Sequence, residues 1–241
     1  MRILSLMTSV CLAIATISHS ETRTLSIATG SYAPFTGQDL PGEGIVNQSV
    51  RNIAKNAGFE ISFDYMPWKR TLEATRRGMY DATSYWYYSE MREPHFIHVG
   101  PVMREREVFF TIADSDVPNW NSLEDLSGLR IGVVPGYTYT PQLWEMGESG
   151  RLTLSEATSD EANLRKLLAG RIDVYPMSET AGWHLISELF SESEQARLRV
   201  LDTPLVISGG YLLVSRSKPD AEAVAQALQI AVDAAEIQLS N

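Results

Sequence analysis

Two periods of hydrophobic and polar residues alternate along the first half of this chain. Apolar residues recur every three or four positions between residues 45 and 57, as on one face of a helix, whereas residues 61–65 alternate apolar and polar, as in a half-buried strand. The predicted elements are a strand at 25–29, a helix at 45–57, a strand at 61–65, a helix at 67–78 and a strand at 84–88. Such alternation favours a largely parallel sheet with helices on both faces.

The second half of the chain repeats this alternation. A capping-box candidate, Thr158–Glu161, precedes a helix that carries Leu164, Leu167 and Leu168. The other predicted elements are strands at 129–134, 152–154, 171–175 and 210–215, and helices that begin near residue 138, run through 181–189 and cover 219–239. The whole chain is therefore predicted to be an α/β protein.

One short pattern occurs in both halves: a helix end, a glycine, two residues, an aspartate and a strand. It spans Arg77–Ala82 and Ala169–Val174. Two lobes of the same architecture would produce this repeat, and a chance match is the alternative. We expect lobe 1 at 21–104, lobe 2 at 105–205 and a return to lobe 1 at 206–241, with chain crossings at Met103–Arg106 and Thr203–Ser208.

The first twenty residues differ from the rest. Arg2 precedes an uncharged, mostly apolar run from Ile3 to Ile17, and small residues follow as far as Ser20. This pattern predicts a signal peptide at 1–20, cleaved near Ser20, and hence a periplasmic protein; a retained N-terminal anchor is the alternative. The single cysteine, Cys11, lies in this segment, so we expect no disulfide and no thiol chemistry in the mature chain.

Charge and motifs exclude several classes of function. The chain carries 30 acidic and 20 basic residues, and this excess argues against nucleic acid and anionic membranes as partners. No nucleophile elbow, phosphate-binding loop or dinucleotide fingerprint is present. His95 and His98 are three residues apart, but His184 is the only other histidine after the predicted signal peptide. We therefore expect no cofactor and no metal site.

Several segments, in this order and spacing, carry a resemblance to a known family. They are "GSYAPF", "NIAKNAGF", "PWKRTLEATRRGMYDA", the arginine after "SEM", "SLEDLSGLRIGVVPGYTY" and "LLAGRIDVYPMSE". Over essentially the whole mature chain, the sequence resembles the family 3 periplasmic solute-binding proteins that serve polar amino acid ABC importers. The resemblance implies a type II periplasmic-binding-protein-like fold: two lobes, each a mostly parallel sheet flanked by helices, joined by two hinge crossings.

The same resemblance implies a function and partners. The protein would be a monomer that captures a small polar or carboxylate-bearing solute, such as an amino acid, between its lobes. An ABC permease would receive the solute, and no bond would be made or broken, so the protein would not be an enzyme.

The resemblance also implies a set of ligand-binding residues. Tyr32 and Trp68 match the positions of two aromatic residues that sandwich the ligand. Arg92 matches an arginine that binds the ligand carboxylate, as the planar guanidinium fork suits a carboxylate. Tyr137 and Thr138 match a helix start that helps to bind the same group, where free backbone N–H groups attract anions.

The chain departs from the family at three places. One is near Thr29, where a second acid that reads basic side chains is absent. Tyr85, Trp86 and Tyr88 stand where small hydroxyl residues are common. Ser178, with Glu179 as its neighbour, stands where an acid commonly binds the ligand amino group. Recognition of an amino acid is therefore incomplete, and an anionic or aromatic ligand without an α-amino group remains open.

The aromatic strand admits two interpretations. Alternation places Tyr85 and Tyr87 on one face and Trp86 and Tyr88 on the other. Either all four pack inside the protein, or at least one tyrosine, Tyr85 or Tyr88, lines the edge of a cleft, since tyrosine offers both a flat apolar face and a hydroxyl.

The charged and aromatic residues around this strand also have alternatives. Arg70 is included among the candidates because it lies beside the expected ligand wall. Trp68 could instead pack within its own lobe, and Arg92 could instead pair with Glu90 or Glu93 at the surface.

Two rival functions fit the same fold. One is an enzyme that resembles the cyclohexadienyl dehydratases, with Glu179 as the acid that expels a leaving group. The other is a ligand sensor whose lobes close to signal to a partner protein.

Overall fold

The computed structural model describes residues 22–135, 137 and 139–239. The predicted signal peptide lies outside the described residues, and so does Thr138. Within the described part of the chain, no helix combines the length and the apolar character that a membrane span requires.

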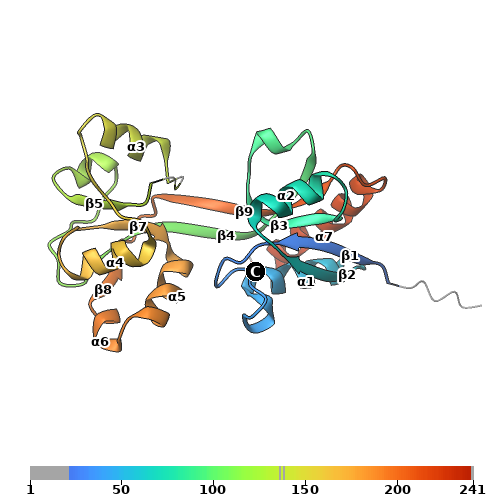
Figure 1. Cartoon of the computed structure of the whole chain (residues 1–241), viewed down its shortest axis with the longest axis horizontal. Helices are drawn as coiled ribbons and strands as arrows, with labels where there is room; N and C mark the ends of the chain where they lie inside the picture. Colours follow the sequence, from blue (N-terminus) through green and yellow to red (C-terminus); the bar gives the residue numbers. More distant parts are fainter. Residues whose placement is uncertain (1–21, 136, 138, 240–241) are drawn as a thin grey trace, which may run out of the picture.

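The long strands β4 (Phe96–Ile112) and β9 (Val206–Ser215) run side by side and connect two groups of elements (Figure 1). We call these two groups lobe 1 and lobe 2. Lobe 1 contains β1 (Thr24–Thr29), η1 (Pro41–Glu43), α1 (Ile45–Asn56), β2 (Glu60–Tyr65), α2 (Trp68–Arg76), β3 (Ala82–Tyr87), η2 (Glu90–Arg92) and α7 (Ala221–Leu239). Lobe 2 contains η3 (Leu123–Leu126), β5 (Arg130–Val133), α3 (Pro141–Glu148), β6 (Thr153–Glu156), α4 (Asp160–Leu168), β7 (Tyr175–Ser178), α5 (Glu179–Leu189), α6 (Glu192–Gln195) and β8 (Leu198–Val200). The boundaries expected at residues 104 and 205 fall inside β4 and just before β9, and they remain a proposal.

One sheet continues from lobe to lobe, in the order β2-β1-β3-β9-β4-β7, and β8 also pairs with β4. β1 is parallel to β2 and β3, and β5 is parallel to β6 in a separate sheet. The two connecting strands are antiparallel to each other and to their other neighbours. The expected parallel pairing therefore holds within these parts of the lobes. It fails at the crossings, because one strand carries the chain into lobe 2 and the other carries it back.

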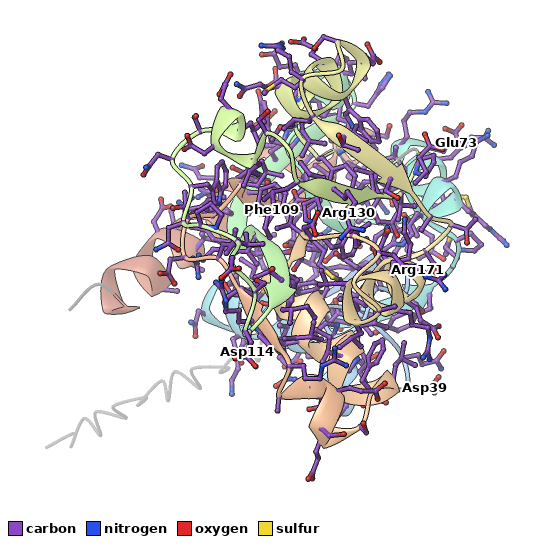
Figure 2. All side chains as sticks on the ribbon, turned by 90° about the vertical axis from the view of Figure 1, so that its left-hand side faces the viewer. Asp39, Glu73, Phe109, Asp114, Arg130 and Arg171 are labelled. Atoms are coloured by element: carbon purple, nitrogen blue, oxygen red, sulfur yellow. The ribbon has the colours of Figure 1, made fainter. Side chains whose placement is uncertain are left out.

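Each lobe has its own hydrophobic core. In lobe 1, α1 and α7 pack together and cover the sheet. In lobe 2, Phe109 and Phe110 on β4 point to opposite faces and belong to two separate clusters. Both side chains are fully buried, which stabilises the fold by about 1.5–3 kcal/mol each. In the end-on view of Figure 2, Phe109 lies inside the ribbon, whereas the exposed Asp39 stands toward the outside.

The repeated sequence pattern has a common structural role. Gly78 and Gly170 follow α2 and α4 with φ of 75° and 65°, a conformation that glycine adopts without strain. Asp81 accepts the backbone N–H of Ser26 in β1 at 2.8 Å. Asp173 accepts the backbone N–H of Arg130 in β5 at 2.7 Å. Each aspartate thus ties its own segment to the first strand of its lobe.

These two aspartates predict a loss of stability in acid. The Arg130 guanidinium lowers the pKa of Asp173, and hydrogen bonds from Ser26 lower that of Asp81 against the effect of burial. Because a lowered folded-state pKa contributes stability above the unfolded pKa, this contribution is lost as the pH falls through the folded pKa. We expect Asp81→Asn and Asp173→Asn each to lower the free energy of unfolding by about 1–3 kcal/mol at neutral pH.

Urea unfolding at neutral and at strongly acidic pH tests this expectation. The exposed Asp114→Asn is the control and should change little. If the two variants lose as much stability in acid as at neutral pH, the loss does not come from the carboxylate charge.

Two local expectations about helix starts were wrong. The helix expected near residue 138 begins at Pro141, and the Thr140 hydroxyl accepts the N–H of Leu143. Proline suits this first position because its missing N–H would have no helical partner. At α4 the cap is Ser159, whose hydroxyl accepts the N–H of Ala162. The third helical residue is then an alanine, which cannot complete a capping box.

Candidate ligand cavity between the lobes

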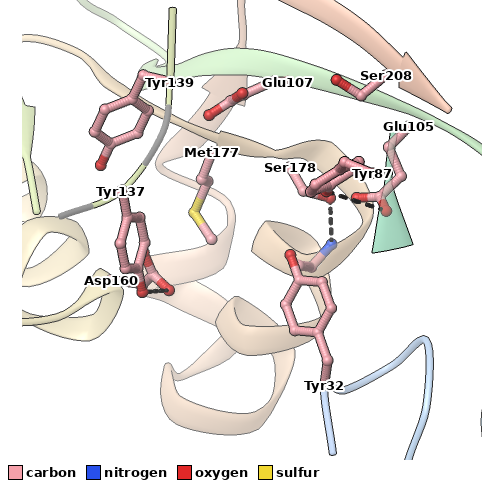
Figure 3. A pocket seen from close by; sticks show the side chains of 11 residues that line it. Tyr32, Tyr87, Glu105, Glu107, Tyr137, Tyr139, Asp160, Met177, Ser178 and Ser208 are labelled. Atoms are coloured by element: carbon pink, nitrogen blue, oxygen red, sulfur yellow. Dashed lines mark hydrogen bonds between the residues drawn. The ribbon is translucent and has the colours of Figure 1, made fainter. Parts of the chain in front are cut away.

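A cavity of about 400 Å³ lies where β4 and β9 pass from one lobe to the other (Figure 3). Residues from both lobes and from both connecting strands line it: Tyr32, Tyr87, Glu105, Glu107, Tyr137, Tyr139, Asp160, Met177, Ser178, Ala181 and Ser208. This volume is in the range of small-molecule sites, and the position at a lobe interface is where such sites are most often found.

The strand β4 places two carboxylates on the cavity side. Its segment Arg104-Glu105-Arg106-Glu107 alternates in charge, and successive side chains of a strand point to opposite faces. Glu105 and Glu107 therefore share one face and both line the cavity. Arg106 points elsewhere, since its guanidinium pairs with Glu179 at 2.7 Å and donates to the Asp202 carbonyl at 2.7 Å.

Glu105 is the most deeply buried of the acidic groups in the cavity. Only 4% of it is exposed. Its Oε1 accepts the Tyr85 hydroxyl and, at 3.4 Å, the Tyr87 hydroxyl. Burial raises the pKa of Glu105, while the hydrogen bonds from Tyr85 and Tyr87 and the nearby Ser178 hydroxyl oppose that rise. Among the described residues, its other oxygen, Oε2, is buried and has no hydrogen-bond partner.

Glu107 lies two residues after Glu105 on β4 and is half-buried. Burial, followed by the negative charges of Glu105 and Asp160, raises its pKa to about 7. A carboxyl group with that pKa is ionised in only part of the molecules at neutral pH. Burial and the neighbouring carboxylates therefore disfavour full ionisation of the acidic groups in the cavity.

Asp160 supplies a third carboxylate, from the first residue of α4. Its Oδ1 accepts the Tyr175 hydroxyl, and its Oδ2 accepts the Tyr137 hydroxyl at 3.2 Å. Burial and this carboxylate raise the pKa of Tyr137 to about 12, so the hydroxyl keeps its proton and donates. The position at a helix N-terminus also favours a negative charge.

Aromatic rings form much of the remaining wall. Tyr137 and Tyr139 lie on the lobe 2 side with ring centroids 5.9 Å apart. Tyr139 is held in place because its hydroxyl oxygen accepts the Val134 N–H at 3.0 Å. On the lobe 1 side, Tyr32 packs on the buried Phe35 with centroids 4.9 Å apart. The cavity thus combines flat apolar faces with acidic groups.

Three of the residues predicted from the sequence line this cavity, namely Tyr32, Tyr137 and Ser178. Ser178 is also the N-cap of α5, since its hydroxyl accepts the Ala181 N–H at 3.2 Å. Thr138 lies outside the described residues. Glu179 is absent from the described lining residues and forms the ion pair with Arg106. This position gives no support to Glu179 as a catalytic acid.

Two of the predicted residues, Trp68 and Arg92, lie together with Trp86 in lobe 1, outside the described lining of the cavity. The rings of Trp68 and Trp86 meet edge to face with centroids 5.3 Å apart. The Arg92 guanidinium lies 4.7 Å from the centre of the Trp86 ring, and one N–H donates to the Tyr87 carbonyl at 2.8 Å. Burial lowers the pKa of Arg92. We call Trp68, Trp86 and Arg92 the tryptophan–arginine cluster.

The aromatic strand divides its tyrosines between different environments. Tyr85 is 7% exposed, and it supports the cavity from behind by binding Glu105. Tyr87, on the same face, reaches the cavity itself. Tyr88 is 52% exposed and donates to Glu93 at 2.6 Å. Arg70 is exposed on α2 and lines a separate depression on lobe 1.

The acidic residues of the cavity were not predicted from the sequence. Glu105, Glu107 and Asp160 were not among the candidates, nor were Tyr87 and Tyr139. The alternation of charge in a segment already expected to cross between lobes was a usable signal for the two glutamates. Asp160 carried no such signal, because an acid at a helix start is common for capping alone.

The raised pKa of Glu107 predicts a gain in stability when its charge is removed. Since the folded state holds this proton more tightly, its stability falls as the pH rises from the unfolded pKa, near 4.3, to the folded pKa. Glu107→Gln avoids this loss. We expect the variant to be more stable than wild type near pH 8. Because the half-buried Glu107 is partly screened by water, the expected difference is only about 1–2 kcal/mol, and it should shrink near pH 5.

Thermal unfolding across this pH range measures the difference. The exposed Glu124→Gln serves as the control for loss of one negative charge. A Glu107→Gln variant that is less stable than wild type near pH 8 would show that the carboxylate is stabilised where it lies.

No protein-family model and no curated protein sequence matches the chain. Solved structures do match it. The second substrate-binding domain of Lactococcus lactis GlnP, in an open conformation, is 18% identical with a TM-score of 0.72, over 91% of this chain and 92% of its own. The unliganded, open L-cystine solute receptor of Neisseria gonorrhoeae is also 18% identical with a TM-score of 0.72, over 90% of this chain and 89% of its own.

A histidine kinase sensor domain with similarity to periplasmic binding proteins is 22% identical with a TM-score of 0.61, over 90% of this chain and 92% of its own. These similarities confirm the predicted fold class. The chain has the α/β fold of the periplasmic-binding-protein-like domains.

Proposed function

We propose that this protein is an extracytoplasmic solute-binding protein that captures a small polar solute between its two lobes without chemical conversion. The observation that carries the proposal is the cavity itself, because both lobes and both connecting strands contribute to its wall. A solute held there would contact all four parts at once, so closure of the lobes around it would add contacts and stabilise the closed form.

The same proposal includes the transport role. Structures of similar fold include a substrate-binding domain of GlnP and an L-cystine solute receptor. By analogy, the protein would be a periplasmic monomer that delivers its solute to an ABC permease after its signal peptide is removed near Ser20. Fold similarity alone supports this analogy.

We propose two sets of contacts for the solute. The first is the cavity lining, with Tyr32, Tyr137 and Ser178 from the sequence-based set. The second is the tryptophan–arginine cluster of lobe 1, where Trp68 offers a stacking surface and Arg92 a partner for a carboxylate. Thr138, Arg70, Tyr85, Tyr88 and Glu179 remain in the candidate set as sequence-based proposals.

A screen by thermal shift tests the proposal. Amino acids, organic acids, aromatic acids and amines are added singly. A solute present at about 100 times its dissociation constant stabilises the folded state by about 2.7 kcal/mol, which raises the melting temperature measurably. We expect at least one compound to do so. If none does, the proposed capture of such a solute is wrong.

A cavity-filling variant shows whether a compound found in this way binds between the lobes. Ser208 lines the cavity from β9, so Ser208→Trp should fill it and abolish the shift. The neighbouring Ile207 points to the other face of the strand and is 58% exposed, which makes Ile207→Trp the matched control. Equal shifts in both variants would place the binding site elsewhere.

A sensory role is a second candidate, because a histidine kinase sensor domain shares the fold. Both roles use the same closure of the lobes and differ in the partner that recognises the closed form. A permease and an ATPase encoded next to this protein would favour import, and a signalling kinase would favour sensing.

A further inference from the structure

The lining of the interlobe cavity has an uneven charge. Glu105, Glu107 and Asp160 contribute three carboxylates, and among the described residues that line the cavity none is lysine, arginine or histidine. Charges interact more strongly in such a partly enclosed place than in bulk water. A cationic group would therefore be attracted to the cavity, and an anionic group alone would be repelled.

One buried carboxylate oxygen indicates a specific binding position within the acidic lining of the cavity. Oε2 of Glu105 is buried and unpartnered within the described part of the chain, although Glu105 itself lines the cavity and is only 4% exposed. The tyrosine hydroxyls of Tyr85 and Tyr87 both bind the other oxygen, Oε1. Leaving a buried acceptor without a donor is unfavourable. The site therefore lacks a hydrogen-bond donor at a defined atom.

The neighbouring groups strengthen the requirement for a positive charge. Glu107 shares the face of Glu105 on β4 and is the cross-strand neighbour of Ser178 on β7. The groups that act electrostatically on Glu107 or respond to it are Glu105 of β4, Asp160 of α4, Tyr87 of β3, Tyr32 of the loop after β1 and Tyr139 of the loop after β5. All are acidic or phenolic, so none supplies a cation to balance the carboxylates.

We propose that the solute carries a protonated amine, and that Glu105 and Glu107 bind this group, with Oε2 of Glu105 accepting one of its N–H bonds. The inference deepens the proposed function and rests on it. The tyrosine rings add cation–π attraction for the same group. A quaternary ammonium would satisfy the charge but not the acceptor, because it has no N–H. The cavity volume of about 400 Å³ suits an organic amine better than a bare metal ion.

Matched sets of small compounds test the proposal. One set is phenylalanine, 2-phenylethylamine and 3-phenylpropionate. The other is norleucine, pentylamine, hexanoate and pentyltrimethylammonium. Within each set the amine and the amino acid share a protonated nitrogen, and the deaminated acid lacks it. In the second set, pentyltrimethylammonium also keeps the positive charge without an N–H. Titration calorimetry gives the dissociation constants.

We expect at least one amine or amino acid to bind about 30-fold or more tightly than the deaminated acid of the same set, the ratio typical of a charge pair removed from water. The trimethylated compound should bind more weakly than pentylamine. Glu105→Gln should lose the preference for the amine, and Glu124→Gln should keep it. If Glu105→Gln does not fold, Glu107→Gln provides the same comparison.

The outcomes separate this inference from the proposed function. Deaminated acids that bind as tightly as the amines, or a Glu105→Gln variant that keeps the preference, would overturn the inference. Failure of every amine and amino acid of the panel to bind at millimolar concentration would overturn it too. The proposed function would still hold in these cases if a compound from the wider screen raises the melting temperature of wild type but not that of Ser208→Trp.

Discussion

Gly210→Ala is expected to lower the free energy of unfolding by at least about 3 kcal/mol. A β-carbon at Gly210 would lie 1.4 Å from Cε2 of the Tyr85 ring, far inside contact distance. The ring cannot move aside easily, because Tyr85 is 7% exposed and packs against Phe35 and Tyr87 with centroids 5.8 and 6.0 Å away. Its hydroxyl is also bound to Glu105. Relief would require β3 and β9 to separate or Tyr85 to leave its site.

The adjacent glycine provides the control for this substitution. A β-carbon at Gly209 would lie 3.0 Å from Pro101 and 3.3 Å from Tyr211, so small shifts suffice. Gly209→Ala should therefore cost less than Gly210→Ala in chemical denaturation. If the two variants are equally stable, Tyr85 is not confined by β9, and its support of Glu105 is weaker than the structure indicates.

Arg92→Ala is expected to weaken the binding of a carboxylate-bearing solute by about 30- to 4,000-fold, the range for truncating one partner of a desolvated charge pair. The guanidinium is already oriented by the Trp86 ring and the Tyr87 carbonyl. One N–H is used in that hydrogen bond, and the remaining donors of the planar group are available to a carboxylate. Arg92→Lys keeps the charge but loses the planar fork, so it should also bind more weakly than wild type.

The ratio of two affinities isolates the effect on the carboxylate. Phenylalanine carries a carboxylate and 2-phenylethylamine does not. Titration calorimetry of both compounds therefore shows whether Arg92→Ala loses affinity for phenylalanine selectively. Affinity for the amine should change little, which also shows that the cavity is intact. If Arg92→Ala binds phenylalanine as tightly as wild type does, Arg92 has only a structural role beside Trp86.

The regular elements of the fold could be predicted because their patterns are local. The strand expected at 25–29 is β1 (Thr24–Thr29), and the helix expected at 45–57 is α1 (Ile45–Asn56). The long strand β4 was not predicted. Pro101 and a register shift between Val99 and Met103 interrupt its pattern, and only pairing with the distant β9 makes it one strand.

The cavity could be predicted only in part, for a related reason. Tyr32, Tyr137 and Ser178 carried a resemblance to known positions. Glu105 and Glu107 did not, because a charged segment is typical of a solvated surface until tertiary packing buries it. That packing depends on contacts between residues far apart in the chain, such as Glu105 with Tyr85, and no local pattern encodes it.

Small-angle X-ray scattering with and without the most stabilising compound of the screen tests the central claim most directly. If the solute binds between lobes joined by β4 and β9, the lobes should close and the radius of gyration should fall at saturation. In Ser208→Trp the same compound should leave the radius unchanged. A wild-type radius that does not change, with the compound demonstrably bound, would contradict capture by closure of the two lobes.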